Sequence, residues 1–182
     1  MKKVCVFLAD GFEEIEGLTV VDILRRAGVE TETVSVMGRK QINGSHGIIV
    51  EADKVFEEAD VADADMLVLP GGMPGTLNLK AHEGLREQIL SFNSQSKYLA
   101  AICAAPTVLS ELGILKGKKA CAYPSFEEEL DCGEVLKVPA VTDGNITTGR
   151  GMGAAIPFAL RLAAILCGDE KAEEIRKSVV YE

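Results

Sequence analysis

The chain has 182 residues, 47% hydrophobic and 26% charged, which is typical of a globular protein, and we expect one domain spanning residues 1–182. Its formal net charge of −9 argues against a nucleic-acid partner, since phosphate backbones are bound by basic surfaces. No run approaches the roughly 20 apolar residues that cross a bilayer, so we expect no membrane partner. The start "MKKVCVFLADGFEE" has no secretory cleavage pattern, which predicts a cytoplasmic location.

The five cysteines are odd in number and widely spaced, with no C-x-x-C pair. This pattern indicates neither a disulfide framework nor a zinc site, and we expect reduced thiols. We therefore predict no metal and no cofactor.

Short apolar runs alternate with helix-like segments along most of the chain, which predicts an α/β fold with a doubly wound, mostly parallel sheet and helices on both faces. The predicted strands are the runs "VCVFLA", "ETETVSVM", "MLVLP", "YLAAICA", "KKACAY" and "NITTG". Residues 38–55 break the alternation, and Asn43-Gly44 there is a turn signal, so a small hairpin is expected to project from the sheet.

The helix predicted after the first strand, "EEIEGLTVVDILRRAG", places two carboxyl groups near its start on the apolar side, those of Glu13 and Glu16. Glu14 falls on the polar side of the same helical wheel, with the charged residues of the later turns. A buried carboxyl is costly unless it is hydrogen-bonded or protonated, so both inward residues are candidates for a functional site. The alternative is that either one only supports the helix N-terminus, where negative charge is favoured.

Cys103 stands where the strand "YLAAICA" turns directly into the helix "AAPTVLSEL". The small residues around it allow a sharp turn, and Pro106 suits the first turn of a helix. A helix N-terminus at the sulfur would lower the thiol pKa and make Cys103 more reactive than the other cysteines. This is the nucleophile-elbow arrangement with cysteine as the nucleophile. The alternative is an inert core cysteine.

The two histidines and one glycine-rich segment give weaker indications of function. Neither His46, in the predicted hairpin, nor His82, at the start of a surface helix, is obviously placed to pair with Cys103, so a Cys-His protease is disfavoured. The segment "GRGMGA" fits a dinucleotide fingerprint, but no later strand supplies an acidic ribose ligand, and we expect its glycines to serve close helix packing.

Unusual residues follow four of the predicted strands, and the carboxyl ends of parallel strands meet at one edge of a sheet, where ligands bind. These segments are Ala9-Asp10-Gly11, Pro70-Gly71-Gly72, Cys103-Ala104 and Gly149-Arg150-Gly151. Their convergence is the main structural indication of a site.

The blocks "ADGFEEIE", "VLPGGMPG", "AAICAAPTVL" and "TGRGMGAAIPFAL" resemble, in order and spacing, the DJ-1/ThiJ/PfpI superfamily over nearly the whole chain. The resemblance, strongest to the DJ-1-like branch, implies a flavodoxin-like fold, usually dimeric, with a reactive Cys103 and a partner Glu16. It further implies an oxyanion pocket made by the backbone amides of Gly72 and Ala104, with Gly71 beside them.

The chain departs from the family pattern at two positions. Ala104 stands where protease-like members have a histidine, and Tyr123-Pro124 stands where other members have His-Pro. The resemblance also places His46 near the neighbouring subunit's site in a dimer. Glu13, Tyr123 and Arg150 are further candidates for supporting or dimer-side positions.

The leading functional expectation is a cofactor-independent cysteine enzyme of glyoxalase or deglycase type, which protects against stress by acting on small carbonyl compounds such as methylglyoxal. The alternative is a redox-sensing or chaperone-type protein in which Cys103 is oxidised without turnover. Peptidase or amidase activity and a role in thiazole phosphate metabolism are further alternatives that the resemblance brings with it.

Overall fold

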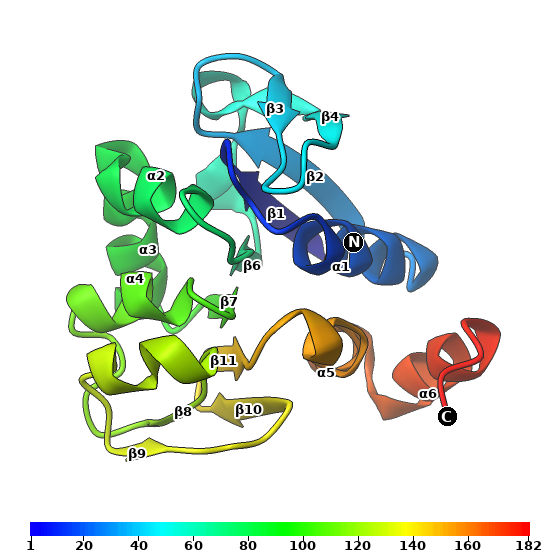
Figure 1. The fold of residues 1–182 in the computed structure, drawn as a ribbon. Coiled ribbons are helices and arrows are strands. Elements are labelled where there is room, and N and C mark those ends of the chain that lie inside the picture. The colour runs from blue at the N-terminus through cyan, green and yellow to red at the C-terminus, as the bar shows by residue number, and fades with distance from the viewer.

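The computed structural model describes residues 1–182, and its centre is a seven-stranded sheet in the order β10-β11-β7-β6-β1-β2-β5 (Figure 1). The strands are β1 (Lys3–Leu8), β2 (Glu30–Ser35), β5 (Lys54–Val55), β6 (Met66–Leu69), β7 (Tyr98–Ile102), β10 (Ala140–Asp143) and β11 (Ile146–Gly149). All neighbours pair in parallel except β10 and β11, which pair antiparallel at one edge. The predicted mostly parallel sheet is confirmed.

Helices cover both faces of this sheet, as a doubly wound fold requires. The helices are α1 (Glu14–Arg26), α2 (Gly75–Ala81), α3 (Glu83–Ser94), α4 (Pro106–Glu111), α5 (Ala155–Cys167) and α6 (Asp169–Ser178). Figure 1 shows α1 and α5 on one face and α2, α3 and α4 on the other, with α6 outside α5. Each face has its own buried apolar cluster, so the sheet lies between two hydrophobic layers.

The central strands are apolar along their whole length because both of their faces are covered. All four residues of β6, "MLVL", are buried, and so are the last five residues of β1. Nothing in such a strand faces water until the strand ends. At this edge of the sheet, site side chains therefore come from the loops and helix starts that follow the strands.

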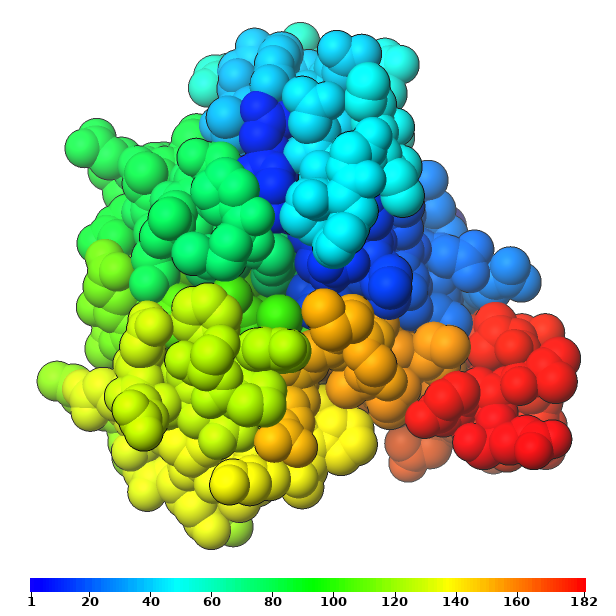
Figure 2. All heavy atoms as spheres, in the orientation of Figure 1, coloured from blue at the N-terminus to red at the C-terminus, as the bar shows by residue number.

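The predicted hairpin is present as β3 (Gln41–Asn43) and β4 (Ile49–Glu51), paired antiparallel through Ile42 and Val50. Its loop, residues 44–48, lies against the start of α1, and Figure 2 shows the cyan atoms of this segment over the blue atoms of α1. Gly44 is needed there because a Cβ atom would overlap the carboxylate of Glu14.

One predicted strand lies outside the main sheet. The run "KKACAY" forms only β8 (Lys119–Ala120), which pairs with β9 (Glu134–Val135) in a separate two-stranded sheet. The expectation of a main-sheet strand was wrong because Cys121 bonds to a side chain instead of to a neighbouring strand's backbone. Its N–H donates to Thr148 Oγ1 at 2.9 Å.

The helices also bear on the membrane expectation. None of them has both the length and the apolar character that a bilayer crossing requires.

Candidate active site

The four strand ends singled out in the sequence meet at one edge of the sheet. Strands β1, β6, β7 and β11 are parallel neighbours, so their carboxyl ends point the same way. Backbone hydrogen bonds join the loops that follow: Glu13 N–H donates to Gly71 O at 2.9 Å, and Cys103 N–H donates to Gly149 O at 2.9 Å. The predicted convergence is confirmed.

Cys103 follows β7 directly and has a backbone φ of 66°, in the left-handed region that residues with a side chain rarely adopt. Both of its backbone groups are paired, since its carbonyl also accepts a 2.9 Å hydrogen bond from Tyr123 N–H. The side chain is buried, with only 6% of the residue exposed. This strained, fully hydrogen-bonded turn holds the sulfur at the sheet edge, as a nucleophile elbow does.

Glu16, in the first turn of α1, is fully buried beside Cys103, as the helical wheel predicts. Its Oε2 atom accepts a 2.8 Å hydrogen bond from Gly71 N–H, whereas its Oε1 atom has no hydrogen-bond partner. An ionised carboxylate with one dry, unpaired oxygen is costly in a protein interior. The neutral acid is therefore favoured, and its proton is available to the neighbouring sulfur.

The two side chains control each other's ionisation. Burial raises the pKa of Glu16 to about 7, against the hydrogen bonds with the Cys103 thiol and the Gly71 amide. Burial also raises the pKa of Cys103 to about 12, and the negative charge of Glu16 and their hydrogen bond add to this. A thiolate at Cys103 is thus disfavoured while Glu16 is ionised, and we infer that the pair shares one proton.

The expected lowering of the Cys103 pKa by a helix N-terminus was wrong. The backbone amides of Ala104 and Gly72 do lower this pKa, but burial and Glu16 outweigh them. In addition, α4 is only six residues long, so its dipole is small.

The amides of Gly72 and Ala104 approach the sulfur from two different loops, as an oxyanion pocket requires. Gly72 has a φ of +90°, and a Cβ atom there would overlap the backbone of Glu13. At Gly71 a Cβ atom would lie 2.6 Å from Cys103 Cβ and 2.7 Å from Glu16 Oε2. Both glycines are therefore required for the backbone to reach the thiol.

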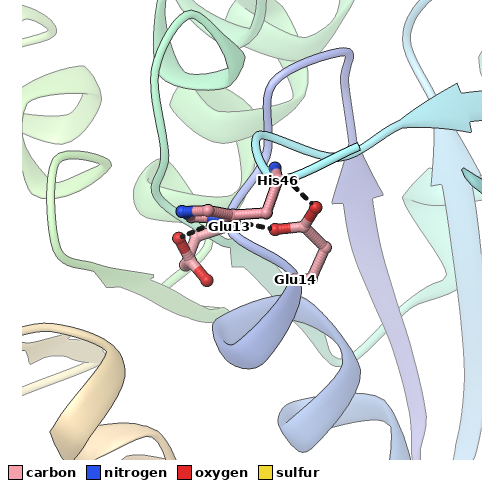
Figure 3. Close-up of side chains that lie close together, drawn as sticks. All are labelled: Glu13, Glu14 and His46. Atoms are coloured by element: carbon pink, nitrogen blue, oxygen red, sulfur yellow. Dashed lines mark hydrogen bonds and ion pairs between the residues drawn. The ribbon is translucent and has the colours of Figure 1, made fainter. Parts of the chain in front are cut away.

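A second polar cluster lies at the start of α1 and consists of Glu13, Glu14 and His46 (Figure 3). Glu13 accepts from Ile15 N–H at 3.3 Å as the helix N-cap, and Glu14 accepts from His46 N–H at 2.8 Å. His46 Nδ1 lies 3.0 Å from Glu14 Oε2 and 3.5 Å from Glu13 Oε2. The cluster joins the hairpin loop to α1.

Glu14 is only 4% exposed, so its assignment to the polar, solvent-facing side of the helix was wrong. The hairpin loop covers it, and this contact between distant segments is invisible to a helical wheel. Burial opposes its ionisation, but hydrogen bonds from backbone amides and from His46 outweigh burial and lower the pKa of Glu14 to about 2. The hydrogen bond to Glu14 and the charges of both glutamates raise the pKa of His46.

The ligand atoms of Glu13, Glu14 and His46 lie within 4.8 Å of one another, so these residues are the group that could hold a metal ion. Here the imidazole and the carboxylates satisfy one another by hydrogen bonds. The side chain of His46 is 68% exposed. His82 caps α3 through a hydrogen bond to Leu85 N–H, outside the site.

A cavity of about 420 Å³ includes Tyr123 and Arg150 in its wall, and the backbone N–H of Tyr123 donates to the carbonyl of Cys103. Arg150 pairs with Glu127 at 3.5 Å, and its Nε atom is buried without a partner. Sequence reasoning missed another residue of this wall, Lys137, which stands far from every motif in the chain. No local sequence pattern indicates Lys137, because only the path of the chain between β9 and β10 brings it into the wall of this cavity.

Of the glycines of "GRGMGA", Gly149 serves close helix packing as expected, whereas a Cβ atom at Gly153 would meet nothing within 4 Å. A Cβ atom at Gly149 would lie 2.8 Å from Phe158 of α5 and 2.9 Å from Ile102 of β7. The close approach of α5 to the sheet thus depends on Gly149.

A flavodoxin-like α/β fold with a buried cysteine on a strained turn, a carboxyl group beside it and two amides facing the sulfur defines one class of protein. The model of the DJ-1/PfpI family matches residues 2–165. The chain belongs to the DJ-1/PfpI family.

Relatives and solved structures agree with this assignment. Protein dj-1beta of Drosophila melanogaster is 35% identical over 181 residues, covering 98% of this chain and 97% of the relative. Protein DJ-1 homolog A of Arabidopsis thaliana is 36% identical over 177 residues, and the match spans 96% of this chain but only 45% of that longer protein. The structure of oxidized Toxoplasma gondii DJ-1 superposes with a TM-score of 0.96 at 35% identity, covering 100% of this chain and 99% of the other.

Proposed function

We propose that the protein is a cysteine enzyme that acts on small reactive carbonyl compounds and converts methylglyoxal to lactate in protection against carbonyl stress. The observation that carries the proposal is the buried pair of Cys103 and Glu16, flanked by the amides of Gly72 and Ala104. A nucleophile, a proton carrier and oxyanion donors are the groups that addition to a carbonyl requires.

The first step is addition of the Cys103 thiolate to the aldehyde carbon, which gives a hemithioacetal. The amides of Gly72 and Ala104 stabilise the negative charge on the carbonyl oxygen, and protonated Glu16 delivers its proton there. Glu16, now a carboxylate, removes the proton from the former aldehyde carbon and returns it to the neighbouring ketone carbon through an enediol. Water then hydrolyses the resulting thioester, which releases lactate and restores the thiol.

This sequence needs no external oxidant or reductant. The aldehyde carbon is oxidised to an acid, while the adjacent ketone carbon is reduced to an alcohol, with one water consumed. A single group that gives and takes protons near neutral pH is sufficient, and the pKa of Glu16, raised to about 7 by burial, suits that task.

The experiment is steady-state formation of lactate from methylglyoxal by the purified protein, measured by an enantiomer-specific lactate assay. The proposal expects turnover that is lost in Cys103→Ser and in Glu16→Gln. Absence of lactate with the unmodified protein, or equal lactate from Cys103→Ser, contradicts it.

A second candidate is a redox sensor, favoured by the unpaired Oε1 atom of Glu16 next to the thiol. Two equivalents of hydrogen peroxide would convert the thiolate to a sulfinate with release of two water molecules. Protonated Glu16 would then donate a hydrogen bond to a sulfinate oxygen. In this case peroxide treatment increases the mass at Cys103 by 32 Da, and this oxidation is faster than any lactate formation.

We further propose that the protein is a homodimer. Exposed apolar side chains gather on α1 and the hairpin, where Ile15 is 54% exposed and Ile48 is 52% exposed. Both line a cavity of about 360 Å³ together with His46. A two-fold contact over this surface would bury them and bring His46 to the subunit boundary, which sedimentation equilibrium at micromolar concentration tests.

The cytoplasm is the compartment that this chemistry suits. All five cysteines are free, and a mechanism through the Cys103 thiol requires a reducing environment. Fractionation of cells that express the protein tests this location.

A further inference from the structure

The cavity of about 420 Å³ that includes Tyr123 and Arg150 differs in charge from the rest of the molecule. The chain as a whole has a net charge of −9, yet the charged side chains in this wall are the cations Lys137 and Arg150. Two tyrosines, Tyr123 and Tyr181, and three prolines are among the other residues of the wall. A cationic, partly aromatic cavity in an acidic protein favours an anionic ligand.

Neither Lys137 nor Arg150 has all of its hydrogen-bond donors paired within the protein. Lys137 forms no side-chain hydrogen bond and no ion pair, unlike Lys116, which lies 3.7 Å from Asp131. Arg150 contacts Glu127 only through Nη2, at 3.5 Å, and its buried Nε atom has no partner. Both side chains therefore have donors left for a ligand.

Two loops of the cavity wall are hydrogen-bonded to the backbone of Cys103. Tyr123, in the wall, donates its N–H to the carbonyl of Cys103 at 2.9 Å. Arg150, also in the wall, directly follows Gly149, whose carbonyl accepts the N–H of Cys103 at 2.9 Å. A molecule with one end in the cavity and the other at the sulfur would lie along these two loops.

We propose that this cavity is a binding site for the anionic end of the substrate, so that the preferred substrate is a 2-oxoaldehyde carrying a carboxylate or a phosphate group. The anionic group binds Lys137 and Arg150, while the oxoaldehyde end reaches Cys103. This inference rests on the proposed function for the reaction, whose steps and balance are unchanged: the product is the corresponding 2-hydroxy acid. It assigns to Lys137 a role in specificity.

The kinetic test compares methylglyoxal, which is neutral, with 4,5-dioxopentanoate, a 2-oxoaldehyde that carries a carboxylate. We expect the unmodified protein to have the higher kcat/KM for 4,5-dioxopentanoate. Lys137→Gln should lower the ratio of kcat/KM for the anionic over the neutral substrate about tenfold, as loss of one charge-assisted hydrogen bond does. Lys137→Arg should restore most of it, and Lys116→Gln is the matched control that should not change it. An equal effect of Lys137→Gln on both substrates overturns the proposal.

A binding measurement separates this inference from the proposed function. Glutarate and inorganic phosphate contain no reactive carbonyl, so calorimetric titration with each reports on the cavity even if no substrate is turned over. We expect one of them to bind, with about tenfold weaker affinity in Lys137→Gln and no change in Lys116→Gln. Tighter binding of glutarate assigns a carboxylate, and tighter binding of phosphate assigns a phosphate ester. If neither glutarate nor phosphate binds, or if Lys137→Gln does not change the affinity, the inference is overturned. If binding depends on Lys137 but no substrate is turned over, only the proposed function is overturned.

Discussion

The carboxyl group of Glu16 accepts a 2.8 Å hydrogen bond from the amide of Gly71, so a side chain of α1 is held by the loop that follows β6. The same loop supplies the amide of Gly72 to the Cys103 sulfur. In the proposed mechanism, this single short loop therefore positions the proton carrier and one oxyanion donor relative to the nucleophile.

Replacing Glu16 should separate thiol reactivity from turnover. In Glu16→Gln the negative charge that raises the Cys103 pKa is gone, so iodoacetamide should alkylate Cys103 faster than in the unmodified protein at pH 8. Lactate formation should nevertheless fall by about 10²–10⁴-fold, because the amide exchanges no proton with the substrate. Alkylation is measured by peptide mass mapping and lactate by enzymatic assay. Turnover of Glu16→Gln at the parent rate would show that Glu16 is structural.

The stability of the protein should depend on the ionisation of Glu16. Because its folded pKa of about 7 is above the ordinary value of 4.5, its contribution is fully present below pH 4.5 and is lost as the pH rises through 7. The Glu16→Gln variant has no carboxyl group to ionise at this position, so it does not lose this stability. Between pH 4 and pH 8, its free energy of unfolding should therefore rise by roughly 3 kcal/mol relative to that of the parent. Urea unfolding across this range measures the difference. A constant difference at every pH would contradict the raised pKa.

A methyl group at Gly71 should disrupt the site. In Gly71→Ala the new Cβ atom would lie 2.6 Å from Cys103 Cβ, 2.7 Å from Glu16 Oε2 and 2.8 Å from Ile102 O. We expect about 1–3 kcal/mol of destabilisation and loss of lactate formation, because the backbone must move away from the pair. The matched control is Gly153→Ala, where a Cβ atom meets nothing within 4 Å. Thermal unfolding compares the two variants, and equal melting temperatures would refute the close approach.

His46 should report on its contact with Glu14. The hydrogen bond to Glu14 and the charges of Glu13 and Glu14 raise the imidazole pKa above 6.5, so this part of the stability is present below pH 6.5 and lost as the pH rises through the folded value. In Glu14→Gln the imidazole pKa, measured by NMR titration of its ring protons, should move back toward 6.5. An unchanged titration would mean that the hairpin loop does not hold His46 against α1 in solution. His82, outside the cluster, serves as the internal control.

The other cysteines should differ in reactivity according to exposure. Cys167 is exposed whereas Cys103 is buried, so the structure does not support the condition on which Cys103 would react before all the others, that it alone combines a helix N-terminus with access to solvent. Limiting iodoacetamide should label Cys167 first and the partly exposed Cys132 next, while Cys5 and Cys121, which are fully buried, react only on unfolding. Cys103 is 6% exposed and burial raises its pKa to about 12, so it should react after Cys132 and before the two fully buried thiols. Labelling of Cys121 together with Cys103 would contradict it.

Local patterns determined the architecture. Apolar runs that fill both faces of a parallel sheet, separated by helices, specify a doubly wound fold without knowledge of any contact. The same patterns located the strand ends that converge, the turn at Cys103 and the inward direction of Glu16, because the parallel direction of the strands and helix periodicity decide them.

Only the tertiary structure decided what depends on groups far apart in the chain. Glu14 is polar by the wheel but buried, because the loop around His46 folds over it. The thiol pKa of Cys103 is raised, because burial and the Glu16 charge together exceed the effect of the amides. Lys137 lines the cavity that includes Tyr123 and Arg150, although no motif surrounds it. Burial, electric fields and cavities are properties of packed surfaces, and a sequence specifies them only through the complete fold.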